Sequence, residues 1–173
     1  WLDYVKPYVD DYIIDTYGTV AAVINPEAKY KVVIEAHADE ISWFVHYITS
    51  EGYIYVRRNG GSDHQIAPSK RVQIHTDNGI IEAVFGWPAI HTRHGGKEEA
   101  PSLKNICLDV GAKDKDEVLK MGIQVGDVIT YPDPLTVLND RWYVGRALDN
   151  RIGGYMIAEV ARLLHKNKKK LPF

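Results

Sequence analysis

Two short segments of the chain combine residue types that could bind a metal ion or take part in catalysis. In the first, His37 and Asp39 follow the apolar run Val32-Val33-Ile34. Alternate side chains of an extended segment point to the same side, so this imidazole and this carboxylate are expected to lie together. An imidazole can bind a metal ion while a neighbouring carboxylate orients it. The same two residues could also form a purely structural pair at the end of a strand.

The second segment, Asp149-Asn150-Arg151, stands where a helix is predicted to begin. Taken alone it is an ordinary helix start, because Asp and Asn oxygens accept hydrogen bonds from the free backbone N–H groups there. Its combination with His37 allows another interpretation, in which the Asp149 carboxylate faces a strand end. One carboxylate can bridge two divalent ions with its two oxygens, as a two-metal hydrolytic site requires. The residues leave capping and metal binding open as alternatives for Asp149.

Other candidate residues carry weaker signals. His91 and His94 have i,i+3 spacing, but they stand in a polar stretch that is predicted to be a long loop, residues 91–105. Cys107 lies in the apolar run Ile106-Cys107-Leu108 and is interpreted as a small buried hydrophobic residue. The chain has no Gly-x-Ser-x-Gly motif and no phosphate-binding glycine loop. The two segments above are therefore the main candidates for metal binding or catalysis.

The elements that must position these residues begin with an α/β zone, residues 1–40. Short β runs are predicted at Tyr12–Thr16 and Thr19–Ile24, separated by a glycine turn. The Val-Val-Ile core of Lys31–Glu40 lacks strict alternation, which indicates a strand covered on both faces, as in an α/β sheet. Ligands of open α/β sheets bind beyond the carboxyl ends of strands, where His37 would then lie.

The second zone, residues 41–143, is predicted to be almost entirely β, with Asn78-Gly79 as its strongest hairpin signal. One short helix is expected at Lys115–Met121, with Asp114 as N-cap and Glu117 completing a capping box. Many short strands with frequent turns indicate a small barrel or sandwich. The predicted strands are Trp43–Thr49, Tyr53–Arg58, Arg71–Thr76, Ile80–Phe85, Ile106–Val110, Asp127–Tyr131 and Arg141–Val144.

The third zone, residues 144–173, contains one amphipathic helix. Ile152, Met156, Val160 and Leu164 recur at four-residue spacing and define an apolar stripe. The lysines of residues 166–170 fall at its end, where cations complement the helix dipole. The order of zones, α/β then β then α/β, favours a β module inserted into a larger α/β domain.

Composition excludes several classes of protein. Among 173 residues, 21 Lys plus Arg balance 23 Asp plus Glu, so no electrostatic footprint for nucleic acid or an acidic membrane surface is present. A single cysteine excludes an internal disulfide. No apolar run approaches the ~20 residues that span a bilayer, and no signal core follows a charged start. We therefore expect neither nucleic acid nor membrane as a partner, and a cytoplasmic location.

Five motifs in series resemble the glutamyl/deblocking aminopeptidase family, the cocatalytic metallopeptidases that include the tetrahedral aminopeptidases. The motifs are Ala36-His37-Ala38-Asp39-Glu40-Ile41, Gly60-Gly61-Ser62-Asp63, Leu108-Asp109-Val110-Gly111-Ala112-Lys113, Gly126-Asp127 and Ala147-Leu148-Asp149-Asn150-Arg151. Their order and spacing match the family across nearly the whole chain. The resemblance implies a zinc-exopeptidase-like mixed α/β sheet, present in part over residues 1–40 and 144–173. It also implies an all-β dimerisation domain inserted at residues 41–143.

The resemblance further implies the chemistry of the site. His37 would bind one of two divalent ions, zinc or cobalt, Asp149 would bridge both, and Asp39 would support His37 without touching the metal. Peptides would be the substrates, and the β-rich insert would mediate self-association. Both ends of the chain look cut, and the family's general-base glutamate and remaining ligands are expected after Phe173, so this chain alone should be inactive. A non-catalytic assembly or binding module and a metal-independent glycan hydrolase remain as alternatives.

Overall fold

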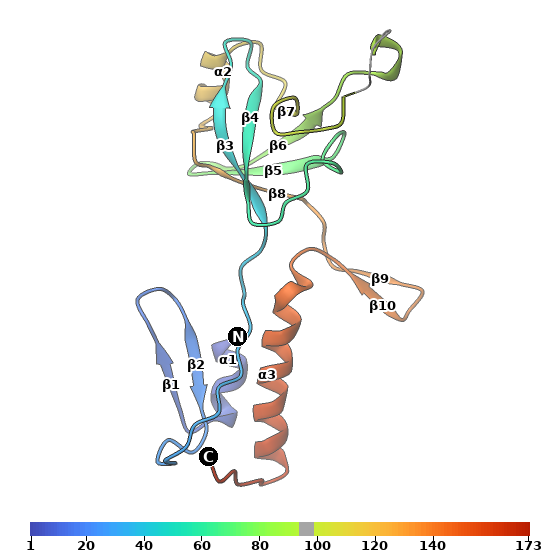
Figure 1. Ribbon diagram of the computed structural model, residues 1–173. Coiled ribbons are helices and arrows are strands. Elements are labelled where there is room, and N and C mark those ends of the chain that lie inside the picture. The colour runs from blue at the N-terminus through green and yellow to red at the C-terminus, as the bar shows by residue number, and fades with distance from the viewer. Residues whose placement is uncertain (94–98) are drawn as a thin grey trace. The chain divides into compact units, whose positions relative to one another are not determined.

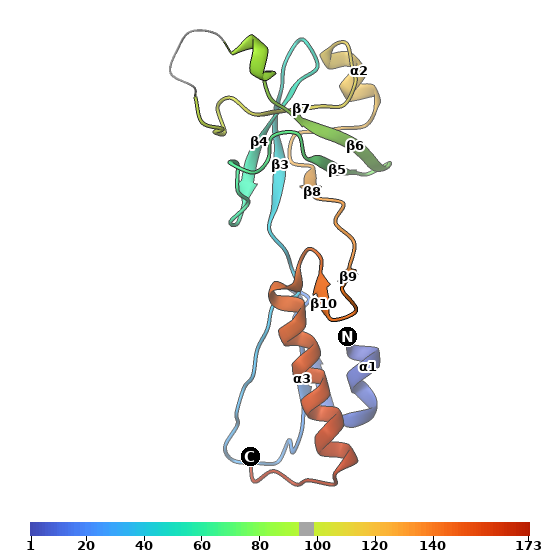
Figure 2. The same cartoon turned by 90° about the vertical axis from the view of Figure 1, so that its right-hand side faces the viewer.

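The computed structural model describes residues 1–93 and 99–173, which fold as a mixed α/β chain (Figures 1 and 2). The chain divides into two compact units. The first unit combines Trp1–Glu40 with Ala147–Phe173, and the second consists of Ile41–Arg146. Each unit is described by itself below.

The first unit contains two helical segments, a β-hairpin and one long helix. It begins with helix α1 (Leu2–Val5) and the 3-10 helix η1 (Lys6–Tyr8), and strands β1 (Asp11–Ile14) and β2 (Val20–Val23) follow. Helix α3 (Leu148–Lys166) completes the unit and lies beside α1 (Figures 1 and 2). The predicted strands around residues 12–16 and 19–24 are thus confirmed as β1 and β2, which pair antiparallel.

Helices α1 and α3 share a small core. Val5, Ala158 and Ala161 are buried. The partly buried side chains that pack around them are Leu2, Tyr8, Val9, Ala22 and Ile24. Two polar contacts fasten the same pair of helices. The indole nitrogen of Trp1 donates to the carbonyl oxygen of Gly154 at 2.6 Å, and the phenol of Tyr4 donates to the carboxylate of Glu159.

The predicted strand at Lys31–Glu40 is wrong. This segment is extended but forms no strand with any described residue, and its apolar side chains are exposed, with Val33 at 83%. The run of apolar residues indicates a surface that favours burial, but a strand also requires a neighbouring backbone to bond. No described strand pairs with this segment, so the pattern was right about apolar character and wrong about pairing.

Helix α3 confirms the predicted third-zone helix, with a difference at its start. Asp149 and Asn150 have non-helical backbone angles, and the peptide bond between them is cis. Oδ1 of Asn150 accepts a hydrogen bond from the N–H of Gly153 at 3.1 Å, so the regular helix begins after Asn150. Part of the predicted apolar stripe is uncovered, since Met156 is 62% exposed.

The second unit is a closed six-stranded barrel with neighbouring strands in the order β3-β4-β7-β6-β5-β8, all antiparallel. Six of the predicted strands correspond to this barrel. Its strands are β3 (Ser42–Ile48), β4 (Ile54–Asn59), β5 (Arg71–Thr76), β6 (Gly79–Gly86), β7 (Cys107–Asp109) and β8 (Val128–Thr130).

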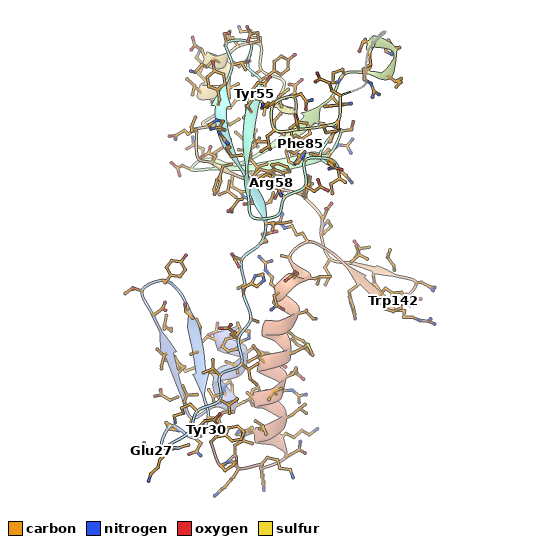
Figure 3. All side chains as sticks on the ribbon, in the orientation of Figure 1. Glu27, Tyr30, Tyr55, Arg58, Phe85 and Trp142 are labelled. Carbon is orange, nitrogen blue, oxygen red and sulfur yellow. The ribbon has the colours of Figure 1, made fainter. Side chains whose placement is uncertain are left out.

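Apolar side chains fill the barrel. Trp43 and Phe85 meet edge to face with ring centroids 5.3 Å apart, and Figure 3 labels Phe85 in this unit. The buried apolar side chains are Trp43, Val45, Ile48, Ile54, Val56, Ala67, Val72, Ile74, Ala83, Phe85, Ile106, Leu108, Val118, Ile123 and Ile129. In β4, β5 and β6 the buried side chains stand at alternate positions, as expected for a half-buried strand. In β3 the register shifts between Val45 and Tyr47, and the alternation is interrupted there.

Two local predictions for this unit are confirmed by its turns and caps. Gly79 has φ +127°, which suits the Asn-Gly turn between β5 and β6. Helix α2 (Lys115–Lys120) is capped by Oδ1 of Asp114, which accepts from the N–H of Glu117 at 2.9 Å. The Glu117 carboxylate reaches back to the N–H of Lys113 at 2.9 Å, one residue before the position expected for a capping box.

An exposed hairpin outside the barrel lies near the end of this unit. Strand β9 (Thr136–Leu138) was not predicted, whereas β10 (Trp142–Val144) corresponds to the predicted strand at Arg141–Val144. Trp142 on this hairpin is 65% exposed (Figure 3). The predicted loop of residues 91–105 begins inside the 3-10 helix η2 (Ile90–Thr92), and residues 94–98 of it lie outside the described residues. No described helix is long and apolar enough to cross a membrane.

Candidate metal centre

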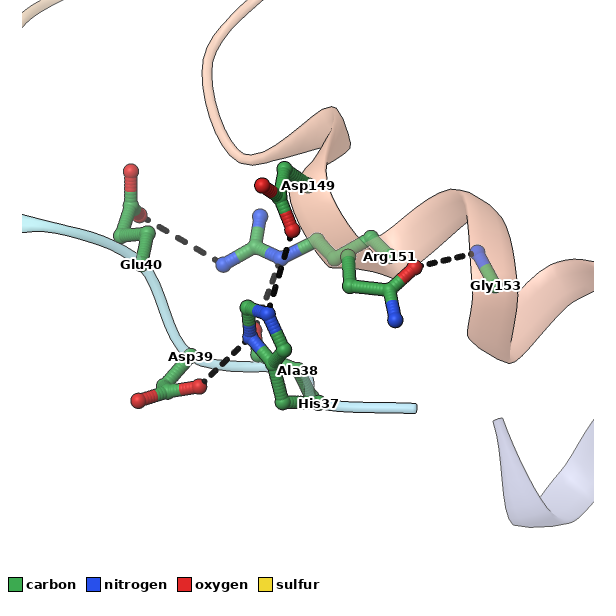
Figure 4. Close-up of polar contacts among 8 residues, drawn as sticks. His37, Ala38, Asp39, Glu40, Asp149, Arg151 and Gly153 are labelled. Atoms are coloured by element: carbon green, nitrogen blue, oxygen red, sulfur yellow. Dashed lines mark hydrogen bonds and ion pairs between the residues drawn. The ribbon is translucent and has the colours of Figure 1, made fainter. Parts of the chain in front are cut away.

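The imidazole of His37 lies between two carboxylates (Figure 4). Its Nδ1 is 2.9 Å from Oδ1 of Asp39, and its Nε2 is 3.2 Å from Oδ1 of Asp149. His37 and Asp39 come from the extended segment that follows residue 31, and Asp149 comes from the start of α3. The structure therefore brings together all three residues that the sequence predicted for the site, two of them separated by 112 positions.

This arrangement favours a charged imidazole in the metal-free protein. An ionised carboxylate only accepts hydrogen bonds, and only the imidazolium form offers an N–H on both nitrogens. Desolvation lowers the pKa of His37, but the hydrogen bond and charge of Asp39 and the hydrogen bond of Asp149 outweigh it, so the pKa lies above its ordinary value of 6.5. A metal ion that binds Nε2 must displace this proton, so acid should oppose metal binding.

Helix capping and metal binding were left open as alternatives for Asp149 at the start of α3. In the structure, another residue caps the helix. Asn150 makes the capping bond to Gly153, whereas the side chain of Asp149 is 97% exposed and contacts His37. The non-helical backbone at Asp149 turns its carboxylate toward the imidazole rather than toward the free N–H groups of the helix. Capping therefore does not account for an aspartate at this position.

Two further residues belong to the site and were missed from the sequence. Nε of Arg151 donates to the carbonyl oxygen of Ala38 at 3.0 Å, and its Nη2 is 3.5 Å from Oε1 of Glu40 (Figure 4). Only 16% of the Glu40 side chain is exposed. Both residues stand inside motifs quoted above, beside His37 and Asp149. Their positions near His37 and Asp149 could have marked them as candidates. The sequence does not predict, however, that the two motifs form hydrogen bonds with each other.

The distances fit a shared metal ion. Two ligands of a tetrahedral zinc, each about 2.1 Å from the ion, lie about 3.4 Å apart. The observed 3.2 Å between Nε2 of His37 and Oδ1 of Asp149 is close to that separation. Asp39 occupies the opposite ring nitrogen, as in the carboxylate–histidine pairs that orient metal ligands. Among the described residues, no group of three or more His, Cys, Asp or Glu could hold a metal ion.

The remaining candidates do not join this site. His91 lies in η2 of the second unit with an exposed side chain, and His94 lies outside the described residues. Cys107 is free and half-buried in β7. Burial, with a smaller contribution from the charge of Asp109, raises the pKa of its thiol, which disfavours the reactive thiolate.

Comparisons with known proteins extend over most of the chain. A family model described as M42 glutamyl aminopeptidase matches residues 18–173. The lysyl aminopeptidase of Pyrococcus furiosus is 29% identical over 169 residues, covering 96% of this chain and 49% of that protein.

Two solved structures resemble the fold. A TET aminopeptidase from a marine sediment archaeon of the Thaumarchaeota superimposes with a TM-score of 0.88 at 24% identity, covering 98% of this chain and 48% of that one. A Pyrococcus horikoshii TET1 peptidase, described as assembling into a tetrahedron or a large octahedral shell, gives 0.75 at 25% identity, covering 96% and 49%. The chain thus spans about half the length of these proteins.

Proposed function

Because this chain belongs to the M42 glutamyl aminopeptidase family, we propose that it provides the first part of a metal-dependent aminopeptidase that removes N-terminal residues from peptides. The observation that carries this proposal is the His37 imidazole held between the carboxylates of Asp39 and Asp149. The name of the Pyrococcus furiosus relative supports the reaction class.

In this proposal His37 and Asp149 hold the metal. Nε2 of His37 would hold one divalent ion, zinc or cobalt, and the Asp149 carboxylate would contribute to holding both ions. Asp39 keeps the imidazole in the orientation and tautomer that present Nε2. Divalent ions at such a site polarise the scissile carbonyl and lower the pKa of water. The general base and the other ligands would lie in the part of the relatives' length that the chain does not cover.

The two units take different roles in this proposal. The first unit belongs to a catalytic domain of the zinc-exopeptidase type. The barrel of Ile41–Arg146 is an inserted module that mediates self-association. The assemblies described for the Pyrococcus horikoshii TET1 peptidase support a homo-oligomer.

Peptidase activity and its loss on chelation test the proposed function. The native protein should hydrolyse aminoacyl anilides, lose activity when a chelator removes metal, and regain it with zinc or cobalt. His37→Ala should abolish activity, whereas His46→Ala should retain it, because His46 is exposed on β3 of the barrel.

Assaying glycans beside the aminoacyl anilides separates the alternatives. A glycan hydrolase would cleave only the glycans and would keep that activity after chelation, because glycoside hydrolysis uses two carboxylates without obligatory metal. A non-catalytic assembly module would show no turnover at any metal concentration. Either result would contradict the proposed function.

A further inference from the structure

Arg151 connects the start of α3 to the backbone between two residues of the site. Its Nε donates to the carbonyl oxygen of Ala38 at 3.0 Å, and its Nη2 is 3.5 Å from the carboxylate of Glu40. Ala38 stands between His37 and Asp39, so this bond holds the backbone that carries both side chains. Figure 4 shows the guanidinium reaching from the helix to this segment.

Few other contacts hold the segment in place. No residue of Val32–Asp39 pairs in a strand or makes a backbone–backbone hydrogen bond with a described residue. Nζ of Lys31, at its beginning, donates to the carbonyl oxygens of Asn25 and Pro26, which precede it in the chain. The bonds from His37 to Asp149 and from Arg151 to Ala38 therefore tie this segment to the start of α3.

A guanidinium suits this contact better than an ammonium group. The N–H donors of arginine point from a rigid plane, so one side chain can reach a carbonyl oxygen and a carboxylate together. Lysine carries the same charge on a flexible stem and lacks this fixed fork.

We propose that Arg151 is a positioning residue that sets the approach of the His37 imidazole to the Asp149 carboxylate. It does so by fixing the carbonyl of Ala38, and it touches neither metal nor substrate. This inference rests on the proposed function, because it assigns Arg151 a role in assembling that metal site.

Cobalt binding to the native, metal-depleted protein tests this inference. We expect Arg151→Lys to weaken cobalt affinity about 10–100-fold, as removal of groups that orient metal ligands typically does. The urea midpoint of unfolding should change little. Arg162→Lys is the matched control, because Arg162 lies on the same helix and pairs with Glu159. Its cobalt affinity should equal that of the unaltered protein.

Chemical rescue separates positioning from a merely structural role. Cobalt affinity of Arg151→Ala should recover with added methylguanidinium and not with methylammonium, since only the former restores the planar donors. Unchanged affinity in Arg151→Lys, in a protein where His37→Ala abolishes cobalt binding, would overturn this inference alone. Unchanged affinity in His37→Ala would overturn the metal site and the role of Arg151 with it.

Discussion

The barrel and the first unit differ in how fully their strands are paired and in how much of their apolar surface is buried. Every barrel strand has two neighbours, and the barrel buries a continuous core around Trp43 and Phe85. The first unit has a hairpin with two free edges among its described residues, and a core of Val5, Ala158 and Ala161. Apolar side chains such as Val33 and Met156 remain exposed there.

This difference places the larger core and the candidate site residues in different units. The self-sufficient barrel contains none of the three candidate site residues, whereas the poorly covered first unit contains them all. Side chains at a metal site must be held by surrounding packing and hydrogen bonds. The first unit supplies a few such contacts, so its geometry should depend on each of them more strongly than the barrel depends on any single surface contact.

The largest expected effect comes from separating the units. Residues 41–146 expressed alone should unfold cooperatively in urea, with a shift in the fluorescence of buried Trp43. Residues 1–40 joined by a short linker to residues 147–173 should show no cooperative transition, because their buried core is too small to offset chain entropy. A cooperative transition in the second polypeptide would remove the contrast between the units.

A core substitution should show the next largest effect. Phe85→Ala should destabilise the barrel by about 3–5 kcal/mol, since a fully buried ring is lost and a cavity remains. Met156→Ala, on the exposed face of α3, should change stability by less than about 0.5 kcal/mol. Urea unfolding of both variants measures the difference, and a comparable loss in Met156→Ala would mean that this face is covered.

Local turn and cap chemistry explains what the sequence predicted well. Asn78-Gly79 and Asp114 act on residues within a few positions of themselves, so their effect can be read without knowing the fold. Strand β9 was missed because Thr136–Leu138 is only three residues long and shows no alternation of apolar and polar side chains.

Contacts between distant segments explain what could not be predicted from spacing alone. The exposed strand-like segment around Val33 was expected to pair, but an apolar run does not specify its partner. The bond from Arg151 to Ala38 joins positions 113 apart, and no local pattern encodes it. His37, Asp39 and Asp149 were placed together only because residue chemistry and a family resemblance pointed the same way.

Within the first unit, the cap of α3 should contribute a moderate amount. Asn150→Ala should cost about 1 kcal/mol, because Gly153 loses the acceptor of its N–H group. Asp149→Ala in the metal-free protein should cost less, because that side chain is exposed and does not cap. Thermal unfolding of the two variants without metal gives the comparison, and a larger loss for Asp149→Ala would assign it the capping role.

The smallest expected effect is a pH dependence of the α1–α3 contact. Hydrogen bonding to Arg162, and then to Tyr4, lowers the pKa of Glu159 from 4.5 to about 2. Because the pKa is lower in the folded state, the contribution of Glu159 is complete above about pH 4.5 and is lost as pH falls toward 2. Glu159→Gln should flatten this part of the stability curve. An unchanged curve would show that the carboxylate is not held by these partners.

Metal occupancy in Asp149→Asn, compared with Asp39→Asn, tests the central claim most directly. Both changes preserve size and remove one charge, but Asp149 is proposed to bridge two ions and Asp39 only to orient His37. Bound zinc or cobalt per chain should fall in both, and excess metal should restore it partly in Asp39→Asn and hardly at all in Asp149→Asn. Full two-metal occupancy in Asp149→Asn would contradict the account.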